Sequence, residues 1–485
     1  MATCNTNLTL EEKEVAILRD AIDIAEKRKG QKITSDPDVK KIISILEDFL
    51  KKKKLVCYGG TAINNILPLE DQFYDKNIEI PDYDFYSSNA LEDAKKLADI
   101  YYEAGFQEVE AKSGVHYGTY KVFVNFIPVA DITYLEKSLF NRVQKEAIRV
   151  YGILYCPPNF LRMNMYLELS RPAGDISRWE KVLKRLLLLN KNYPLKGKHC
   201  DPKTFQRKFE EVDSGKEEQL YYAVRDAFID QGLVFFGGYA SFLYSTYMPA
   251  KQRKMFHKTP DFDVLSEEPE KAAIMLKERL EDFDYTGIQI IKHDGIGELI
   301  APHVEVKVKI NKIHETVAFI YKPLACHSYN VVKKGNKSVR VATIDTMLSF
   351  YFAFFYSGRE YYDDDRIVCM AQYLFDVQQK NRLQQKGVLK RFSIDCYGKQ
   401  ETLEEMRNIK SEKYKELKGD RGSKEYESWF LRYVPFEQHT YNKSQSHSNK
   451  KTKDNKKHSS RASTTKKRNK KTKKNAKGKG IFGLF

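Results

Sequence analysis

The chain has 485 residues, of which 41% are hydrophobic and 31% are charged. This length corresponds to two or three domains, and the apolar content is enough to build buried cores, which excludes a wholly disordered protein. The net charge of +17 is concentrated near the C-terminus, since residues 443–480 hold 16 Lys and Arg against the single acid Asp454. The rest of the chain is therefore nearly neutral.

Several protein classes lack support in the sequence. The longest apolar runs, such as Leu186–Leu189, are far shorter than the roughly 20 residues of a membrane span, and the N-terminus has no signal-peptide pattern. The seven Cys are scattered and never form CxxC, so neither a disulfide framework nor a structural zinc site is expected. We expect a soluble protein of a reducing compartment, with no membrane partner.

The chain begins with two predicted helices. Thr9 and Glu12 form a capping-box pattern ahead of apolar residues at helical spacing, and Gly30 is expected to end this helix. A second helix is expected to start at Ser35-Asp36-Pro37 and to end at Lys51–Lys54.

Shorter elements follow. The residues Leu55–Tyr58 have the pattern of a buried strand, Gly59-Gly60 of a tight turn, and Thr61–Leu67 of a short helix. The further expected elements are a strand at 81–85, a helix at 90–104, an alternating strand at 120–126 and a strand at 129–134.

The same order of elements recurs about 180 residues later. Leu233–Ala240 repeats the strand and Gly-Gly turn of Leu55–Ala62, and Thr259–Val264 repeats the Asp-x-Asp strand. Helix 269–283, strand 304–310 and the segment Val339–Val341, matched to Ile148–Val150, continue the repeat. The sequence therefore predicts a duplicated α/β unit.

Acidic residues of the first copy form a candidate metal site. Asp82 and Asp84 are alternate residues of one strand, so their side chains point to the same face, and Asp131 lies on a strand expected nearby. Carboxylates are ligands suited to Mg²⁺, and three of them can hold two ions for an in-line phosphoryl displacement. The acidic run Asp363–Asp365 has no adjoining phosphate turn, so we interpret it as a solvated loop.

The turn Gly59-Gly60-Thr61 lies between a strand and a helix N-terminus, where backbone N–H groups favour a phosphate. A phosphate site beside a metal site suits a nucleoside triphosphate. The sequence has neither the Walker pattern GxxxxGK[ST] nor GxGxxG, so ordinary nucleotide hydrolases and dinucleotide-binding proteins lack support. The chain segments around Arg162, Lys181 and Lys184 are candidate triphosphate contacts.

These residues carry a family resemblance. The motif Tyr58–Ala62, the pair Asp82 and Asp84, and Asp131 resemble the DNA polymerase β-like nucleotidyltransferase superfamily. More narrowly, the tandem arrangement over about residues 30–400 resembles the poly(A) polymerase catalytic subunit of large cytoplasmic DNA viruses of the poxvirus, asfarvirus and mimivirus kind. The gap from Gly60 to Asp82 is longer than is usual in the superfamily and requires an inserted loop.

The resemblance implies template-independent addition of AMP from ATP to an mRNA 3′ end with two Mg²⁺ or Mn²⁺ ions. It implies that Asp82, Asp84 and Asp131 are catalytic metal ligands and that Gly59, Gly60 and Thr61 bind the triphosphate. It suggests the host cytoplasm, at the viral factory, or the virion as the location. Whether the chain acts alone, as a homodimer or with a processivity subunit stays open.

The second copy lacks one acid. It keeps Gly237-Gly238 and Asp261-x-Asp263, but Phe319 stands where Asp131 would recur, unless Glu305 or Glu315 takes that role. We expect this copy to be catalytically silent. Its candidate phosphate contacts are Lys307, Lys309 and Lys312, which could equally line a solvated strand.

Five regions follow from these patterns. We predict an α+β protein with two tandem nucleotidyltransferase-like mixed-sheet units, the second of them degenerate, and a disordered basic tail that tethers RNA. Alternatives are a nucleotidyltransferase of another base or linkage specificity, or a non-catalytic RNA-binding scaffold. The expected regions are a helical segment 1–54, a catalytic unit 55–200, a second unit 201–400, a helical extension 401–442 and the tail 443–485.

Overall fold

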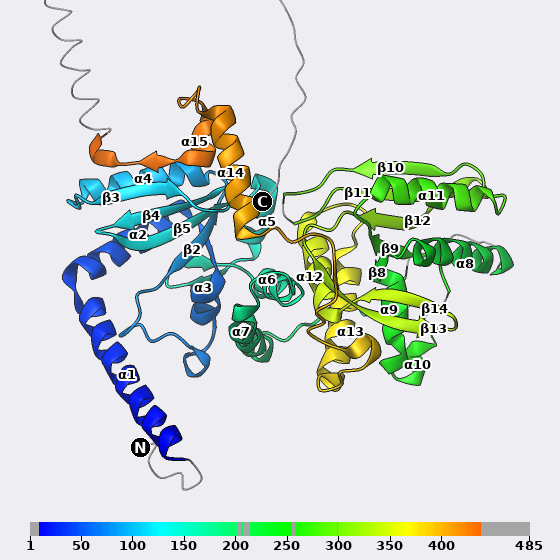
Figure 1. The fold of residues 1–485 in the computed structure, drawn as a ribbon, viewed down its shortest axis with the longest axis horizontal. Coiled ribbons are helices and arrows are strands. Elements are labelled where there is room, and N and C mark those ends of the chain that lie inside the picture. Colours follow the sequence, from blue (N-terminus) through cyan, green and yellow to red (C-terminus); the bar gives the residue numbers. More distant parts are fainter. Residues whose placement is uncertain are drawn as a thin grey trace, which may run out of the picture.

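The computed structural model describes residues 9–198, 200–201, 205–206, 214–254, 256, 258–297 and 299–437. These residues form two eight-stranded mixed sheets, each flanked by helices, which lie side by side in Figure 1. The predicted α+β architecture with two mixed-sheet units is confirmed. The predicted tail 443–485 lies outside the described residues.

The first sheet has the strand order β16-β3-β4-β5-β2-β1-β7-β6. At its centre β2 is antiparallel to β1 and parallel to β5, and β1 is parallel to β7. Alternate residues of these strands are buried, for example Tyr83 and Phe85 in β2, as expected for a sheet with one face on the core. The strands are β1 (Val56–Tyr58), β2 (Tyr83–Ser87), β3 (Val109–Ser113), β4 (Thr119–Val124), β5 (Ile127–Tyr134), β6 (Ile148–Val150), β7 (Ile153–Tyr155) and β16 (Arg432–Tyr433).

Helices α2 and α4 pack against the core side of this sheet. Helix α2 starts at Pro37 with Asp36 as its N-cap and buries Val39, Ile42 and Leu46, as the sequence predicts. The inserted loop is also present, because residues 67–82 contain only the short turn η2 (Leu69–Asp71). The helices of this half are α1 (Leu10–Ser35), α2 (Pro37–Lys53), α3 (Gly59–Ile66), α4 (Ala90–Glu103), α5 (Lys137–Glu146), α6 (Pro158–Leu169) and α7 (Trp179–Asn192), with the turn η3 (Ile176–Arg178).

The second sheet has the strand order β10-β11-β12-β9-β8-β14-β13-β15. Its strands are β8 (Val234–Phe236), β9 (Phe262–Leu265), β10 (Gln289–His293), β11 (His303–Ile310), β12 (Ile313–Tyr321), β13 (His327–Lys334), β14 (Lys337–Ala342) and β15 (Cys396–Tyr397). The helices of this half are α8 (Ser214–Asp230), α9 (Gly237–Tyr244), α10 (Ala250–Arg253), α11 (Pro269–Glu281), α12 (Ile344–Ser357) and α13 (Asp364–Asn381), with the turns η5 (Ser245–Tyr247) and η6 (Gly387–Leu389).

The two sheets share one topology. The strands β3, β4, β5, β2, β1, β7 and β6 have the same order and relative directions as β10, β11, β12, β9, β8, β14 and β13. The predicted duplication is therefore present, with one correction. Strand β14, which contains Val339–Val341, matches β7 and not β6 (Ile148–Val150), because β7 and β14 are the strands that pair in parallel with β1 and β8. The predicted match was wrong because both segments have an Arg between two apolar residues.

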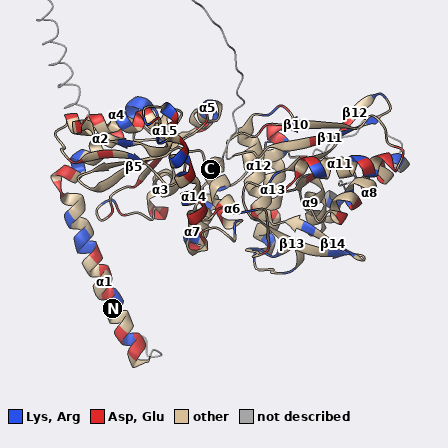
Figure 2. Cartoon of the chain, turned by 45° about the horizontal axis from the view of Figure 1, so that its top comes forward, with Lys and Arg blue, Asp and Glu red and all other residues tan. Residues whose placement is uncertain are grey.

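Helix α1 differs from its predicted form. It has the predicted capping box at Thr9 and Glu12, but it continues through Gly30 to Ser35. None of its residues is buried, and Ile17 and Leu18 are more than half exposed. Figures 1 and 2 show α1 projecting from the first unit, with acidic and basic residues interspersed along it.

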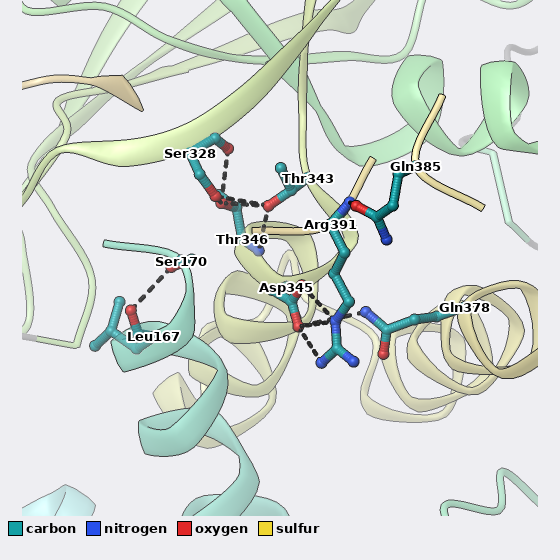
Figure 3. Close-up of polar contacts among 9 residues, drawn as sticks. All are labelled: Leu167, Ser170, Ser328, Thr343, Asp345, Thr346, Gln378, Gln385 and Arg391. Atoms are coloured by element: carbon teal, nitrogen blue, oxygen red, sulfur yellow. Dashed lines mark hydrogen bonds and ion pairs between the residues drawn. The ribbon is translucent and has the colours of Figure 1, made fainter. Parts of the chain in front are cut away.

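Helices α6 and α12 join the two units. Helix α12 is mostly apolar and almost wholly buried, which fits its position between the halves. The amide of Ser328 donates to the carbonyl of Ser170, at the end of α6, at 2.8 Å. Beside this junction Arg391 donates to both carboxylate oxygens of the buried Asp345, at 2.8 and 3.0 Å (Figure 3). A buried charge pair with two hydrogen bonds fixes the segment after η6 on α12.

The C-terminal elements return to the first unit. After α14 (Leu403–Leu417) and α15 (Lys424–Phe430), strand β16 pairs antiparallel with β3. Helix α15 lies on the α4 side of the sheet, where Tyr120 donates to the carbonyl of Ser428 and Lys95 of α4 contacts Glu427. The predicted helical extension is thus an edge of the first unit (Figure 1).

The sequence predicted neither disulfides nor a membrane span. Disulfides join Cys200 to Cys369 and Cys326 to Cys396, each with Cα atoms 5.1 Å apart, so the expectation of no disulfides was wrong. The partners are 169 and 70 residues apart, and such distant pairs leave no local Cys pattern. Among the described residues, no helix is long and apolar enough to cross a membrane.

Candidate active site

The Gly-Gly turn connects β1 directly to α3. Gly59 has a φ of +74°, and a Cβ atom there would lie 2.5 Å from Oδ2 of Asp84. Glycine is required because both the backbone conformation and the close carboxylate exclude a side chain. Among the described residues no side chain caps the start of α3, so its first N–H groups are available to an anion.

The three predicted acids lie around this turn. Asp84 is the in-register partner of Asp131 on the parallel strand β5 and of Tyr58 on β1. Asp82 precedes β2 and is separated from Asp84 by the buried Tyr83, so both carboxylates lie away from the core. The structure therefore places Asp82, Asp84 and Asp131 on one face of the sheet.

The carboxylates repel one another. Burial, followed by the charges of Asp82 and Asp131, raises the pKa of Asp84 to about 7. Burial and the charge of Asp131 also raise the pKa of Asp82, while Lys121 and Lys181 oppose that shift. A concentration of negative charge that its own cations do not neutralise is suited to bind a divalent cation.

The three carboxylates do not form a complete set of metal ligands in this structure. Within the described part of the chain, no group of three or more His, Cys, Asp or Glu side chains is placed to hold a metal ion. Asp131 instead accepts a short hydrogen bond from Lys121 on β4, its in-register neighbour. The chemistry of the three carboxylates fits a divalent cation, whereas their present positions do not enclose one.

The side chain of Thr61 makes a hydrogen bond within the protein. Its hydroxyl donates to the backbone carbonyl of Asp82 at 2.6 Å, and the side chain is buried. Thr61 therefore holds the entry to β2 in place. A contact from Thr61 to a triphosphate stays a prediction.

Arg185 of α7 lies over the turn and was not recognised in the sequence. A Cβ atom on Gly60 would lie 2.6 Å from Oη of Tyr74 and 2.9 Å from a guanidinium nitrogen of Arg185. Arg185 donates to Tyr74 at 2.5 Å, and its guanidinium lies 4.9 Å from the centre of the Phe73 ring. A positive side chain beside a helix N-terminus, which is itself positive, favours an anion between them.

The candidate cations of the sequence have different surroundings. The charge of Lys181 lowers the pKa of Asp82, against the larger effect of burial. Lys181 lies one helical turn before Arg185, on the same side of α7. Lys184 pairs with Glu180 on the exposed side, and the buried Arg162 donates to Asn159 and Asn190. The spacing of Lys181 and Arg185 is the signal that could have identified Arg185.

A cavity of about 250 Å³ opens beside Asp82. Asn64 shapes its wall, because Oδ1 of Asn64 accepts hydrogen bonds from the backbone N–H groups of Phe73 and Tyr74. Polar and aromatic side chains around a concave site are typical of a pocket for a small polar ligand. The residues that line it include Glu47, Thr61, Asn64, Asn65, Tyr74, Lys76, Asp82 and Tyr83.

The second unit has a different arrangement at the same positions. Asp261 is buried and paired with Arg366 at 2.9 Å, so an arginine occupies the position that a cation would need. Asp263 lies opposite Phe319, which the repeat of the motifs places where Asp131 would recur. Phe319 packs on Tyr361 with ring centres 5.3 Å apart. Glu305, considered as an alternative third acid, accepts from Thr316 and contacts His293.

The chain is similar to several known proteins. Residues 44–175 match the family model described as Poly(A) polymerase catalytic subunit. A protein of African swine fever virus (strain Badajoz 1971 Vero-adapted), provisionally named a poly(A) polymerase catalytic subunit, is 33% identical over 178 residues, which are 36% of this chain and 36% of the relative. A protein of Acanthamoeba polyphaga mimivirus with the same provisional name is 32% identical over 201 residues, 40% of this chain and 33% of the relative. The matched segment thus spans about a third of the length of these curated relatives.

The fold has a wider match. The crystal structure of the Megavirus polyadenylate synthase superposes with a TM-score of 0.73 at 20% identity, over 91% of this chain and 90% of that chain. The family resemblance predicted from the Gly-Gly turn and the three acids is confirmed for residues 44–175, and the fold is confirmed across both units.

Proposed function

We propose that this chain is a viral poly(A) polymerase, which adds AMP from ATP to RNA 3′ ends without a template. The observation that carries the proposal is the pairing of Asp84 with Asp131, beside Asp82 and the bend at Gly59. The relatives' names and the fold of the Megavirus enzyme support the choice of polyadenylation among nucleotidyltransferase reactions.

Different groups around the turn bind different parts of the substrates. The N–H groups at the start of α3 receive the triphosphate, and Arg185 contacts it from the other side of Gly60. Lys181 lies near enough to Asp82 to attract the same anion. The cavity beside Asp82, with Asn65 and Tyr74 in its lining, is the candidate site for the base or for the primer end.

The carboxylates Asp82, Asp84 and Asp131 would hold the divalent ions. When bound there, Mg²⁺ or Mn²⁺ would activate the primer 3′ hydroxyl and neutralise charge on the leaving pyrophosphate. Lys121 would release Asp131 for this role, because a lysine ammonium and a divalent cation compete for the same oxygen. The close approach of Asp84 to Gly59 keeps the triphosphate next to these acids.

The second unit is proposed to be catalytically silent. Phe319 cannot bind a cation, and Arg366 already neutralises Asp261. This unit buttresses the first through α12, which packs on α6. A contribution of Lys307, Lys309 and Lys312 to RNA binding stays a prediction, as does tethering of RNA by residues 443–485.

Four parallel reactions test the proposal. The full chain is incubated with Mg²⁺, a labelled RNA primer and one ribonucleotide at a time, and the products are resolved by length. Extension with ATP alone is expected. Extension with another nucleotide would identify a different nucleotidyltransferase, and no extension with any of them would favour a non-catalytic RNA-binding protein.

A further inference from the structure

A row of basic residues crosses the first sheet and ends at the candidate active site. Arg432 of β16 is the in-register partner of Lys112 on β3, and Lys112 is the partner of Lys121 on β4. Lys121 is in turn opposite Asp131, which is opposite Asp84. Directly opposed residues share one face of a sheet, so these five side chains form one line across five strands.

The three cations of this line are accessible. The side chains of Lys112, Lys121 and Arg432 are 44%, 38% and 78% exposed. Helix α15 covers the opposite side of the sheet, where Tyr120 contacts Ser428, so up to residue 437, where the described chain ends, the C-terminal return leaves the basic line uncovered. The line is thus a surface that a ligand can reach.

The line also carries unfavourable charge pairs. Like charges directly opposite on neighbouring strands are destabilising, and Lys112 has a cation opposite it on both sides. In the described structure Glu110 is the acidic contact of both Lys112, at 3.2 Å, and Arg432, at 3.8 Å. One carboxylate for two cations leaves a positive excess that a polyanion would neutralise.

The second unit provides an internal comparison. At the positions of Lys112, Lys121 and Asp131 its sheet has Ile291, Glu305 and Phe319, which are paired in the same register. Glu305 and Phe319 are buried. The fold therefore does not require a basic line, which is a property of the unit that bears the three acids.

We propose that Arg432, Lys112 and Lys121 bind the phosphates of the RNA primer and lead its 3′ end to the carboxylates. The proposal rests on the proposed function and assigns the primer site that the function requires. Neighbouring strands are about 4.8 Å apart, so the cations line a path of about 14 Å from Arg432 to Asp131. Lysine and arginine side chains on such a path contact the backbone without reading sequence, as the extension of a growing homopolymer requires.

An aromatic ring lies beside the path. The ammonium of Lys112 is 4.1 Å from the centre of the Phe123 ring, and Phe123 is half-buried next to it on the same face. Aromatic side chains beside a basic groove stack with the bases of single-stranded nucleic acid. Phe123 would therefore support a primer base while Lys112 holds the adjoining phosphate.

Salt-dependent binding of RNA by the full chain tests the path. The double variant Lys112→Ala/Arg432→Ala is compared with wild type, using a labelled oligoadenylate of about 12 nucleotides and anisotropy at several salt concentrations. Removing two phosphate contacts should reduce the slope of log K against log salt by about 1.4, since each contact contributes about 0.7 on a single strand. The basic tail contributes equally to both proteins and cancels from the difference.

Two controls accompany this measurement. Lys292→Ala removes a lysine from β10, the matching edge region of the second unit, and should leave the slope unchanged. The charge-preserving variant Lys112→Arg/Arg432→Lys should keep the wild-type slope, which separates lost charge from a damaged sheet. In extension assays the alanine double variant should raise the KM for primer and leave the KM for ATP unchanged.

An unchanged slope in the alanine double variant would overturn the path, whether or not the protein adds AMP. A raised KM for ATP with normal RNA binding would assign the cations to the nucleotide and would also overturn it. If the wild type adds no nucleotide but the alanine double variant shows the predicted loss of slope, the proposed function is refuted and the RNA path is kept. Failure of the RNA path and failure of the proposed function therefore give different results.

Discussion

Asp84 and Asp131 face each other in register on the parallel strands β2 and β5, whereas Asp263 faces Phe319 at the matching position of the second sheet. The two units share one topology but thus differ at this equivalent position. The first unit has three mutually repelling acids. In the second unit an aromatic residue replaces one acid and Arg366 neutralises another.

The repulsion at Asp84 predicts a pH-dependent stability of the metal-free protein. Because the folded-state pKa is raised from 3.8 to about 7, the stability from this carboxyl is fully present below pH 3.8, where both states are protonated, and is lost as the pH rises from there through about 7. The difference corresponds to at most about 4 kcal/mol. Thermal melting in chelator should give a lower Tm at pH 8 than at pH 6.

The variant Asp84→Asn removes the titrating group and should flatten this pH dependence. It should also reduce the rise in Tm that wild type shows when Mg²⁺ is added at pH 8, because ligands that bind only the folded state stabilise it. An equal Mg²⁺ response in wild type and in Asp84→Asn would contradict the assignment of Asp84 to cation binding.

Arg185 is predicted to bind the triphosphate. A hydrogen bond to a charged group contributes about 1.5–3 kcal/mol, so Arg185→Gln should raise the KM for ATP by about ten- to a hundredfold. Lys184→Gln is the matched control, since Lys184 is the next residue toward the N-terminus and pairs with Glu180 in solvent. If both variants keep the wild-type KM for ATP, the triphosphate lies elsewhere.

The ion pair of Asp345 and Arg391 is predicted to stabilise the fold around α12. Asp345→Ala leaves a largely buried guanidinium without its partner, and breaking a buried pair in this way costs about 3–5 kcal/mol. Denaturant unfolding should show this loss. Glu180→Ala, which breaks an exposed pair, should leave the unfolding midpoint unchanged, and similar midpoints for both variants would argue against a structural role for Asp345.

Deletion of residues 443–485 is predicted to weaken RNA binding and shorten the products, while the first AMP addition is retained. The 16 Lys and Arg between 443 and 480 would raise the local concentration of RNA through charge alone. Product length on a long primer, measured across salt concentrations, checks this. A truncated chain with unchanged product length and salt dependence would exclude tethering.

Sequence patterns predict those features of the fold that depend on neighbouring residues in the chain. The turn at Gly59, the alternation of Asp82 and Asp84 and the repeat at Gly237 all have short signatures, because a tight turn and a half-buried strand each restrict neighbouring residues. The sequence predicted Asp131 on a nearby strand, whereas the register that sets it opposite Asp84 came from the structure.

Contacts between distant segments have no such signature. Arg366 is 105 residues from Asp261, and Arg432 reaches Lys112 only because β16 returns to the first sheet. The disulfide partners of Cys200 and Cys326 are similarly remote.

The exposure of α1 has a local reason that the helical spacing of Val15, Leu18 and Ile22 obscured. Ile17 and Ile24 lie off that face, so the apolar residues of α1 are spread around the helix, whereas those of α2 form one buried face.

The most direct measurement compares AMP incorporation by the variants Asp84→Asn and Asp263→Asn, with Mg²⁺, ATP and an RNA primer. The two residues occupy the same position in the two sheets. If the acids of the first unit carry the reaction, Asp84→Asn should lose at least about a thousandfold in kcat, while Asp263→Asn keeps a rate close to wild type. Equal losses in the two variants, or full activity in Asp84→Asn, would contradict the account.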